Sequence, residues 1–393
     1  MVKILPPTAS IDWDQISIAT NLGLGHVEST YHMSTGRWSD PVFVNDPYLR
    51  VHGLAPGLQY GQQCYEGLKA FRTPKGRVSI FRPDKHAKRM SHSTSTISIP
   101  NIPESLFLAS VELAVTSNSS YIPPHTSRAM LYIRPFAFGS SEMIGLVPPS
   151  EFKFCVYVKP VPAYHGLSAQ DALILMSFDR AAPHGLGHAK VGGNYAPVIK
   201  WSEQAKADGF GMTLHLDSKT RTEIDEFSTS GFLGIKVSDE GLSQWWHPVA
   251  PALSTVQQAT AVFSLLGIMD GKWKRDHYQI KYTELPEFSE VVAVGTAASV
   301  VSIRSITLED SRETVRYLDV TTNQGRYARK LSTSLDDIMH CRVEDVFGWC
   351  HQVGEAPVED VTTRKMGSSN KKPAFVDIMT LSCAGQGARF SCH

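Results

Sequence analysis

Apolar positions along the chain fall into two patterns, short runs and stretches with helical spacing, and both recur throughout. Short segments rich in β-branched and aromatic residues predict strands, and they lie at 77–81, 129–136, 152–158, 172–176, 212–216 and 291–294. Apolar residues three and four positions apart predict helices, and they lie at 84–93, 104–118, 198–207, 256–266 and 327–339. Because strands and helices are mixed, the pattern predicts an α/β or α+β fold.

Two changes in composition divide the chain. The strand pattern gives way to Pro, Gly and Ser around 160–169, which indicates a loop between domains. We therefore expect a small N-terminal domain at 1–159, an interdomain loop at 160–171 and a larger domain at 172–355. After Gly354 the composition becomes small and polar, which is typical of loosely ordered segments, so we expect a C-terminal extension at 356–393.

The overall charge and hydropathy exclude some classes of function. The 393 residues carry 38 basic and 38 acidic side chains, without the clustered Lys and Arg of a nucleic-acid binder, so nucleic acid is not an expected partner. No window approaches ~18 consecutive apolar residues, and the start of the chain lacks an apolar signal segment, so no membrane association is expected. The six cysteines lack C-x-x-C spacing, and no metal is expected. We expect a cytoplasmic protein, and a mitochondrial location stays open.

The most informative run surrounds Lys190, which lies among four glycines at 185, 187, 192 and 193. A glycine-rich loop before a helix suggests phosphate binding, but the spacing fails both the dinucleotide pattern and the P-loop pattern. A lysine confined between closely packed backbones can lose its proton and react with an aldehyde, and pyridoxal 5′-phosphate is the aldehyde cofactor that fits. The alternative is an ordinary solvated lysine on a loop.

A pyridoxal phosphate site also needs a carboxylate at the pyridine nitrogen and donors for the phosphate. Strand alternation at 222–227 places Glu226 on the opposite face from Glu223 and Asp225, which makes Glu226 the better candidate for a buried acid. Backbone N–H groups at 254–257 and 295–298 can bind a phosphate, and Arg89 can add a guanidinium. Taken singly, each of these features is more often a helix cap or a surface group.

Taken together, several stretches resemble the class IV pyridoxal-phosphate aminotransferases, and most of all the branched-chain amino-acid aminotransferases. They run in family order from about residue 20 to 352, and they are QQCYEGLKAFR at 62–72, IFRP at 80–83 followed by Arg89, LYIRP at 131–135, KVGGNY at 190–195, GTA at 295–297 and VEDVFGW at 343–349. The resemblance implies fold type IV: a small N-terminal α/β domain, a larger C-terminal domain with a pseudo-barrel sheet, and a cofactor in the cleft between them. It also implies a homodimer.

The resemblance assigns roles to individual residues. It implies that Lys190 binds the cofactor covalently, that Tyr195 contacts the cofactor's ring oxygen and that Glu226 contacts its pyridine nitrogen. The phosphate-binding residues that it implies are Arg89, Val256, Gln257 and Thr296. The substrate-binding residues that it implies are Tyr60 from the other subunit, Tyr65, Tyr132, Arg134, Thr229 and Ala297. Of these, Arg134 is expected to handle the second carboxylate of glutamate.

The resemblance implies transamination between a branched-chain or similar hydrophobic L-amino acid and 2-oxoglutarate, giving a 2-oxo acid and L-glutamate. Four positions differ from the family's usual residues: Gln59, Leu186, Gly231 and Gln257. We therefore expect a broader substrate range and a specialised, secondary-metabolite pathway. The alternatives are a lyase of the same fold, a transaminase of D-amino acids or amines, and a non-catalytic binding or scaffold paralogue. The joint retention of the lysine, the acid, the arginine and the tyrosine argues against the scaffold.

Overall fold

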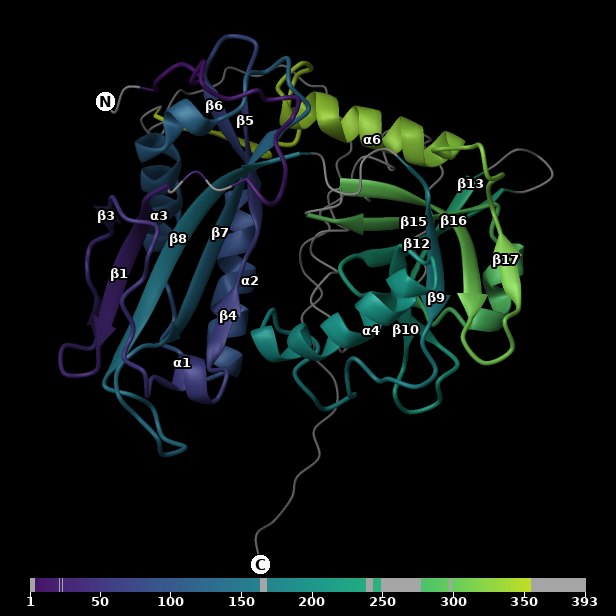
Figure 1. Ribbon diagram of the computed structural model, residues 1–393, viewed down its shortest axis with the longest axis horizontal. Helices are drawn as coiled ribbons and strands as arrows, with labels where there is room; N and C mark the ends of the chain where they lie inside the picture. The colour runs from purple at the N-terminus through teal and green to yellow at the C-terminus, as the bar shows by residue number, and fades with distance from the viewer. Residues whose placement is uncertain are drawn as a thin grey trace, which may run out of the picture. The chain divides into compact units, whose positions relative to one another are not determined.

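The computed structural model describes residues 4–20, 22, 24–162, 168–237, 243–248, 277–296 and 299–354. Met1–Gly354 forms one compact unit, and Glu355–His393 is a second unit that lies outside the described residues, as does the C-terminal extension predicted at 356–393. The first unit contains two β-sheets with helices packed against them (Figure 1).

The first sheet comes almost entirely from the N-terminal half of the unit. Its strands are β1 (His26–His32), β2 (Arg37–Trp38), β3 (Val42–Val44), β4 (Gln63–Tyr65), β5 (Leu68–Arg72), β6 (Val78–Phe81), β7 (Met130–Gly139), β8 (Glu151–Val161) and β18 (Cys350–Gln352). In the described part their order is β18-β6-β5-β7-β8-β1-β2, with β3 beside β1 and β4 beside β7. Its helical segments are α1 (Pro56–Gln59), α2 (Pro83–Thr96), α3 (Glu104–Ser117) and the 3-10 turn η1 (Ser119–Tyr121).

Helices α2 and α3 bury one side of this sheet. Helix α2 begins at Pro83, whose fixed φ suits a first helical turn, and Asp84 adds a negative charge there. Helix α3 packs against β1 and β8, and its Phe107 and Val111 are fully buried in the apolar cluster beneath. The two helices thus fix the sheet from which several of the predicted site residues project.

Strand β8 extends further than the sequence pattern predicted. It continues to Val161, because β7 pairs with it as far as Met130 opposite Val161. Strand β1 pairs with β8 only up to Val156, so Pro160 lies where β8 has a single neighbour in the described part. A proline lacks an N–H donor, which an edge position tolerates. The Pro-rich stretch therefore starts inside the strand, and 163–167 lie outside the described residues.

The second sheet curls until its two ends meet. Its strands are β9 (Gln170–Ile174), β10 (Met212–Leu216), β11 (Ile224–Phe227), β12 (Gly231–Val237), β13 (Ser243–Pro248), β14 (His277–Tyr278), β15 (Glu290–Gly295), β16 (Ser299–Leu308) and β17 (Thr314–Arg316). In the described part the order runs from β11 through β10, β9, β16, β15, β12 and β13 to β14, with β17 beside β16. Backbone N–H groups of Ile224 and Tyr282 donate across the closing edge to Ile280 O at 2.7 Å and Thr222 O at 2.9 Å. This closure agrees with the predicted pseudo-barrel.

Helices cover the second sheet and join it to the first. They are η2 (Gly192–Asn194), α4 (Ala196–Ala207), η3 (Tyr282–Glu287) and α6 (Arg326–Met339). Helix α6 buries Ala328, Leu331, Leu335 and Ile338 along one face, as expected of an amphipathic helix. These residues pack in one cluster with Phe71 of β5 and with residues of β12 and β15.

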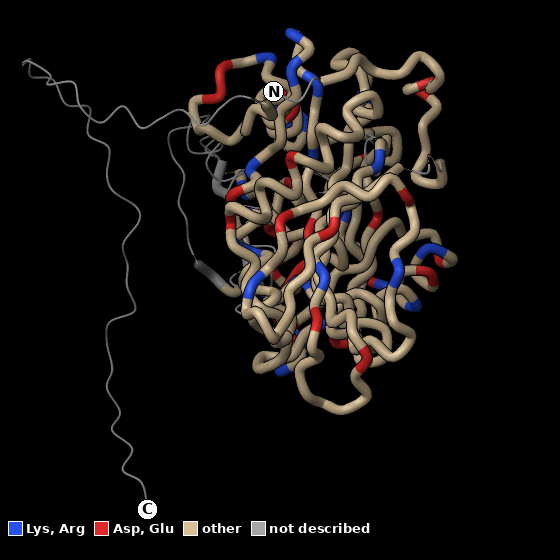
Figure 2. Tube along the Cα trace, turned by 90° about the vertical axis from the view of Figure 1, so that its left-hand side faces the viewer, with Lys and Arg blue, Asp and Glu red and all other residues tan. Residues whose placement is uncertain are grey.

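The predicted strands and helices that fall within the described residues are present in the structure. All six predicted strands are confirmed as β6, β7, β8, β9, β10 and β15, and four predicted helices are confirmed as α2, α3, α4 and α6, with shifted ends. The helix predicted at 256–266 lies outside the described residues. Basic and acidic residues are interspersed along the trace (Figure 2). No described helix is both long enough and apolar enough to cross a membrane.

Candidate active site

The loop that carries Lys190 is clamped between β4 and α2. The Tyr65 N–H of β4 donates to the Lys190 carbonyl at 3.1 Å, and the Lys190 N–H donates to Ser93 Oγ of α2 at 2.9 Å. Within the loop, the Asn194 amide nitrogen donates to two backbone carbonyls at 2.7 and 2.9 Å. The backbone of Lys190 is therefore fixed from both sides, and the Asn194 side chain fixes the loop from within.

Two glycines here lie in close contact with neighbouring side chains. A Cβ at Gly192 would lie 1.9 Å from the side-chain nitrogen of Gln63, and a Cβ at Gly67 would lie 2.1 Å from the Tyr132 hydroxyl. Neither position can accept a larger residue without displacing its neighbour. The glycines thus serve to pack the lysine loop onto β4 and to admit the Tyr132 ring.

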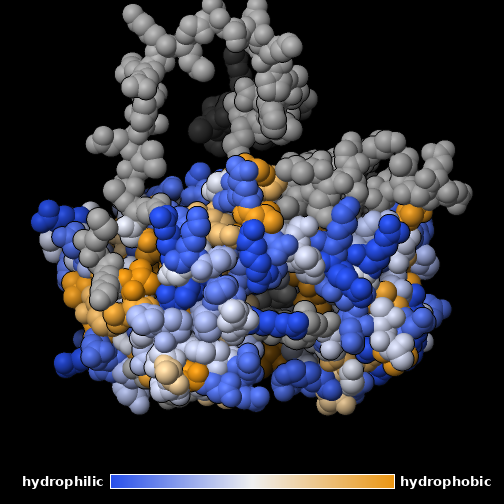
Figure 3. Space-filling view, turned by 90° about the horizontal axis from the view of Figure 1, so that it is seen from above, coloured by the Kyte–Doolittle hydropathy of each residue, from blue (hydrophilic) through white to orange (hydrophobic). Residues whose placement is uncertain are grey.

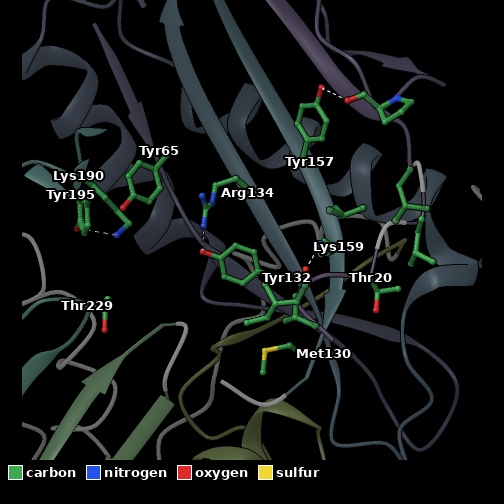
Figure 4. A pocket seen from close by; sticks show the side chains of 16 residues that line it. Thr20, Tyr65, Met130, Tyr132, Arg134, Tyr157, Lys159, Lys190, Tyr195 and Thr229 are labelled. Carbon is green, nitrogen blue, oxygen red and sulfur yellow. Dashed lines mark hydrogen bonds between the residues drawn. The ribbon is translucent and has the colours of Figure 1, made fainter. Parts of the chain in front are cut away.

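The Lys190 amine lies between two aromatic rings. Its Nζ is 3.1 Å from Tyr195 Oη, and it lies 4.6 Å from the ring centroid of Tyr65 and 4.8 Å from that of Tyr195. Burial by itself would raise the pKa of Tyr195, but the charges of Lys190 and Arg180 outweigh it, so this pKa lies below its usual value. Figure 4 shows the Lys190 and Tyr195 side chains facing each other at one end of a cavity.

Glu226 is a fully buried acid on β11, as strand alternation predicted. It is 1% exposed, whereas Asp225 beside it is only partly buried. Arg180 donates a hydrogen bond from Nη1 to Glu226 Oε1, and its guanidinium carbon lies 5.3 Å from the Tyr195 ring centroid. A single cation therefore contacts both the buried acid and the tyrosine that holds the lysine.

Two further titratable groups, His215 and Asp225, lie near Arg180 and Glu226, and their pKa values are shifted. Burial, together with the nearby Arg180 charge, lowers the pKa of His215 to about 3, so this histidine is neutral at physiological pH. Burial raises the pKa of Asp225 to about 7, and repulsion from Glu226 adds to the effect. The buried positive charge of Arg180 is thus balanced by the Glu226 carboxylate.

Arg89 projects from α2 into a second buried ion cluster. Its Nη2 donates to Glu66 Oε2 at 2.7 Å and its Nε donates to the other oxygen, while His86 Nδ1 lies 2.7 Å from Glu66 Oε2. Glu66 lies between β4 and β5, where its N–H donates to the Pro135 carbonyl at 2.7 Å. Burial alone would raise the pKa of Glu66, but Arg89 and His86 hold it well below its usual range. The Arg89 guanidinium is therefore held in place by a bidentate hydrogen bond to the Glu66 carboxylate.

Tyr132 and Arg134 lie on the same face of β7, as their spacing predicted. Arg134 Nη2 donates to Tyr132 Oη at 3.0 Å, and the guanidinium carbon lies 4.9 Å from the Tyr65 ring centroid and 5.1 Å from that of Tyr132. In Figure 4 the Arg134 and Tyr132 side chains lie between the Lys190 end of the cavity and Met130. Arg134 is exposed, so its charge is open to a ligand.

A cavity of about 600 Å³ brings most of the predicted substrate residues together with the lysine. The predicted residues that line it are Tyr65, Tyr132, Arg134, Lys190, Tyr195 and Thr229. This volume is within the range of pockets that hold small organic ligands. Thr229 follows β11, so both sheets contribute to its walls.

Other predicted residues do not reach this cavity or fall outside the description. Tyr60 is 50% exposed and donates its hydroxyl hydrogen bond to the Ile144 carbonyl, away from Lys190 of its own chain. Thr296 follows β15 and is partly buried, but it does not line the cavity. Val256, Gln257 and Ala297 lie outside the described residues.

The residues that are described fit pyridoxal 5′-phosphate. Arg89 Nη1 is buried and has no hydrogen-bond partner among the described residues, which leaves a cationic donor for an anion such as phosphate. Lys190 offers an amine beside a hydroxyl. Glu226 offers a buried carboxylate, which is paired with Arg180 and does not itself line the cavity. No group of three His, Cys, Asp or Glu side chains that could hold a metal gathers in the described ranges.

Comparisons with known proteins give the family. The model of the family described as "Amino-transferase class IV" matches residues 63–306. An aminotransferase of Gibberella zeae is 88% identical over 393 residues, covering all of both chains. Aminotransferase atnJ of Emericella nidulans is 51% identical over 335 residues, covering 85% of this chain and 96% of that protein. The chain belongs to the class IV aminotransferases.

A solved structure shows the same fold. The branched-chain amino acid aminotransferase of Thermobaculum terrenum, described in its PLP-form, superimposes with a TM-score of 0.66 at 18% identity, covering 85% of this chain and 100% of that one. The predicted family, fold class and enzyme class are therefore confirmed.

Three charged residues of this aminotransferase site were not singled out by the sequence: Glu66, His86 and Arg180. Glu66 and His86 lie in or beside matched motifs, but nothing in a one-dimensional pattern shows that they meet Arg89. Arg180 is the first residue of the glycine-rich run, but its ion-pair partner is Glu226 on β11. The sequence alone does not show which charged residues pair in three dimensions, and so it did not identify these three.

Proposed function

We propose that the protein is a pyridoxal 5′-phosphate-dependent aminotransferase. It transfers the amino group of a branched-chain or similar hydrophobic L-amino acid to 2-oxoglutarate, and gives the 2-oxo acid and L-glutamate. The observation that supports this most directly is the 3.1 Å contact between Lys190 Nζ and Tyr195 Oη at the wall of the cavity. A lysine held beside a hydroxyl and between two rings is suited to nucleophilic catalysis on an aldehyde cofactor.

Different residues of the chain have different roles in the proposed reaction. Pyridoxal phosphate supplies an electron sink for the negative charge that develops at the substrate's Cα. Arg89 binds the phosphate through its free Nη1, and Glu66 keeps that guanidinium in place. Lys190 would hold the cofactor when it is bound, and its Nζ would take the Cα proton once a substrate amine has replaced it. Tyr195 orients Lys190 and the ring oxygen.

The far side of the site provides for the substrate. Arg134, opened to the cavity and oriented by the Tyr132 hydroxyl, binds the second carboxylate of 2-oxoglutarate or glutamate. The rings of Tyr65 and Tyr132 contact the hydrophobic side chain. Since one cavity must accept both a dicarboxylate and an apolar substrate, the side-chain pocket is expected to be broad. A broad pocket agrees with a role in a specialised pathway.

A homodimer is part of the proposal. Exposed apolar residues gather around α1 and in the loop between β7 and β8, namely Leu54, Leu58, Tyr60, Ile144, Leu146 and Val147. The Met143 N–H donates to Leu54 O at 3.1 Å, and Tyr60 donates to Ile144 O, so the two segments form one surface. Figure 3 shows the opposite end of the molecule from α1, where the face is largely hydrophilic with smaller apolar patches. We propose that Leu54, Leu58, Tyr60 and the loop contact a second copy, with Tyr60 reaching the partner's site.

The test is a substrate screen that follows glutamate formation from 2-oxoglutarate. L-Leucine, L-isoleucine or L-valine is expected to react, Lys190→Ala to abolish turnover, and the exposed control Lys206→Ala to leave it intact. Turnover of D-amino acids or amines alone would contradict the L-amino-acid assignment. Product release without an amino acceptor would indicate a lyase, and a protein that takes up no pyridoxal phosphate would indicate a scaffold.

A further inference from the structure

The cavity continues well beyond the residues that the proposed reaction uses. Its floor is one face of β7 and β8, formed by three cross-strand pairs: Arg134 with Tyr157, Tyr132 with Lys159, and Met130 with Val161. From Lys190 beside β4, the cavity crosses β7 and then β8 (Figure 4). Strand spacing of ~4.8 Å makes this crossing roughly 10 Å long.

The end opposite Lys190 is bordered by described residues of the segment that precedes β1. Ile18, Leu22 and Leu24 line the cavity there, together with Pro47 from the stretch after β3. None of these four side chains is polar, whereas the Lys190 end carries a guanidinium, three tyrosine hydroxyls and a threonine hydroxyl. The cavity is therefore most polar where the reaction takes place. At its far end the polar side chains of the lining are Thr20, Tyr157 and Lys159, and the remaining lining residues there are apolar.

Two side chains of β8 tie this wall to the floor. Lys159 donates from Nζ to the Ile18 carbonyl, and Tyr157 donates its hydroxyl to the Pro47 carbonyl at 3.3 Å. The Tyr157 ring also stacks on His26 at a centroid distance of 4.5 Å. Because the Lys159 ammonium group donates its hydrogen bond to the Ile18 carbonyl, this lysine presents its aliphatic stem to the cavity.

The charges of the lining favour one class of side chain. Its charged members are Arg134, Lys159 and Lys190, and no carboxylate is among the described lining residues. A cationic substrate side chain would find no carboxylate partner among the described residues at the far end. A substrate carboxylate would bind Arg134, which lies nearer to Lys190 than the far end does. A branched side chain of leucine size, placed beside Tyr65 and Tyr132, leaves the far wall without contacts.

We propose that Ile18, Leu22 and Leu24 form the far wall of the substrate side-chain pocket, and that the preferred amino donor is an L-amino acid with a long, unbranched alkyl side chain. This inference rests on the proposed aminotransferase function and specifies its substrate class. Each methylene that reaches the apolar floor or wall is removed from water, so longer chains bind better until the wall is met.

The experiment compares straight-chain L-amino acids, from norvaline through norleucine to 2-aminoheptanoate and 2-aminooctanoate, with the full-length holoenzyme. We expect kcat/KM to rise about fourfold per added methylene, the factor that corresponds to ~0.8 kcal/mol, with most of the change in KM. The first variant, Leu22→Ala, removes wall surface. The second, Ile18→Asp, places a charge at a position that is 60% exposed and so tolerates it. The control Leu5→Ala changes the same segment away from the cavity.

Both wall variants are expected to lower the ratio of kcat/KM for 2-aminooctanoate over norvaline at least fourfold, and Leu5→Ala to leave that ratio unchanged. A wild-type kcat/KM that stays flat or falls beyond norvaline would overturn the inference, while the reaction of norvaline would leave the proposed function standing. An unchanged ratio in both wall variants would also overturn it, and would mean that another element, such as the partner subunit, bounds the pocket. If no amino acid reacts at all, the proposed function itself fails.

Discussion

At the scale of single residues, the site depends on buried charges that are paired before any ligand arrives. Glu226 and Arg180 are 1% and 8% exposed and contact each other, and Glu66 and Arg89 are 0% and 3% exposed and do the same. Removing one member of such a pair leaves the other charge unpaired in a medium that solvates it poorly. The pairs therefore fix the positions of the acid and of the phosphate-binding cation.

The first prediction distinguishes the acids of β11. Glu226→Gln should lower kcat by about 10²–10⁴-fold, because the pyridine nitrogen would lose its carboxylate partner, yet the protein should still take up pyridoxal phosphate through Lys190 and Arg89. Asp225→Asn is the matched control, since its side chain is on the other face, and it should cost less than about tenfold. Cofactor uptake is measured by visible absorbance and turnover by glutamate release. An essential Asp225 with a dispensable Glu226 would contradict this assignment.

Sequence reasoning reached some of these residues and missed others for a physical reason. Glu226 was predicted correctly as buried because strand alternation is local and has a period of two. Arg180 and Glu66 were not assigned, because their roles depend on partners 46 and 23 residues away. Local periodicity contains no information about such pairs. The roles of Val256, Gln257 and Ala297 remain predictions outside the described residues.

At the scale of elements, Lys69 links the two sheets close to the site. It lies on β5 beside Tyr132, is 3% exposed, and donates from Nζ to Ser299 Oγ at 2.5 Å. Ser299 begins β16 with a φ of 57°, a left-handed conformation that is uncommon outside glycine. This contact therefore anchors the connection between β15 and β16, which contains Thr296.

The second prediction concerns Lys69→Met. Burial lowers the pKa of Lys69 to about 7, although Asp336 partly opposes the effect. The native protein thus binds fewer protons than the unfolded chain between pH 7 and the usual lysine pKa, and its stability falls as pH decreases through that window. Lys69→Met should raise the free energy of unfolding by about 1–3 kcal/mol at pH 6 and by less at pH 10. It should also lower kcat/KM by about tenfold, because Ser299 loses its anchor.

Urea unfolding at pH 6 and pH 10, together with steady-state kinetics, measures both effects. Lys75→Met, an exposed position in the turn after β5, should change neither. A Lys69→Met protein that is less stable at pH 6 than the wild type would show that the ammonium group is stabilised in the native state. Equal activity would show that the β15–β16 connection does not need this anchor.

Ten of the described elements were predicted from local patterns, whereas long strands such as β1, β12 and β16 were missed as well as very short ones. Long elements such as β7, β8 and α6 have enough residues for a clear period of two or 3.6. Strands β2, β3, β14 and β18 contain only two or three residues each, and their pairing depends on tertiary neighbours. Strand β18 in particular pairs with β6 from the other end of the chain, which local patterning does not reveal.

At the scale of the whole molecule, the proposed dimer makes a prediction by complementation. If Tyr60 serves the partner's site, Tyr60→Ala and Lys190→Ala should each be inactive alone, and subunits mixed through unfolding and refolding should recover turnover. The mixed dimer then contains one site with both changes and one intact site. If Tyr60 serves its own site, every site in the mixture has a defect and turnover stays absent. Sedimentation of each variant checks that the dimer is intact.

The pairing of β18 with β6 also orders events during synthesis. The ribosome releases β6 early, but its partner Cys350–Gln352, and the Trp349 carbonyl that accepts the Arg82 N–H at 2.7 Å, emerge only near the end of the described chain. Until then one edge of the first sheet has unpaired backbone groups, which favour pairing with other nascent chains. A translational stop or cleavage before residue 350 should therefore yield aggregated protein rather than a soluble N-terminal fragment.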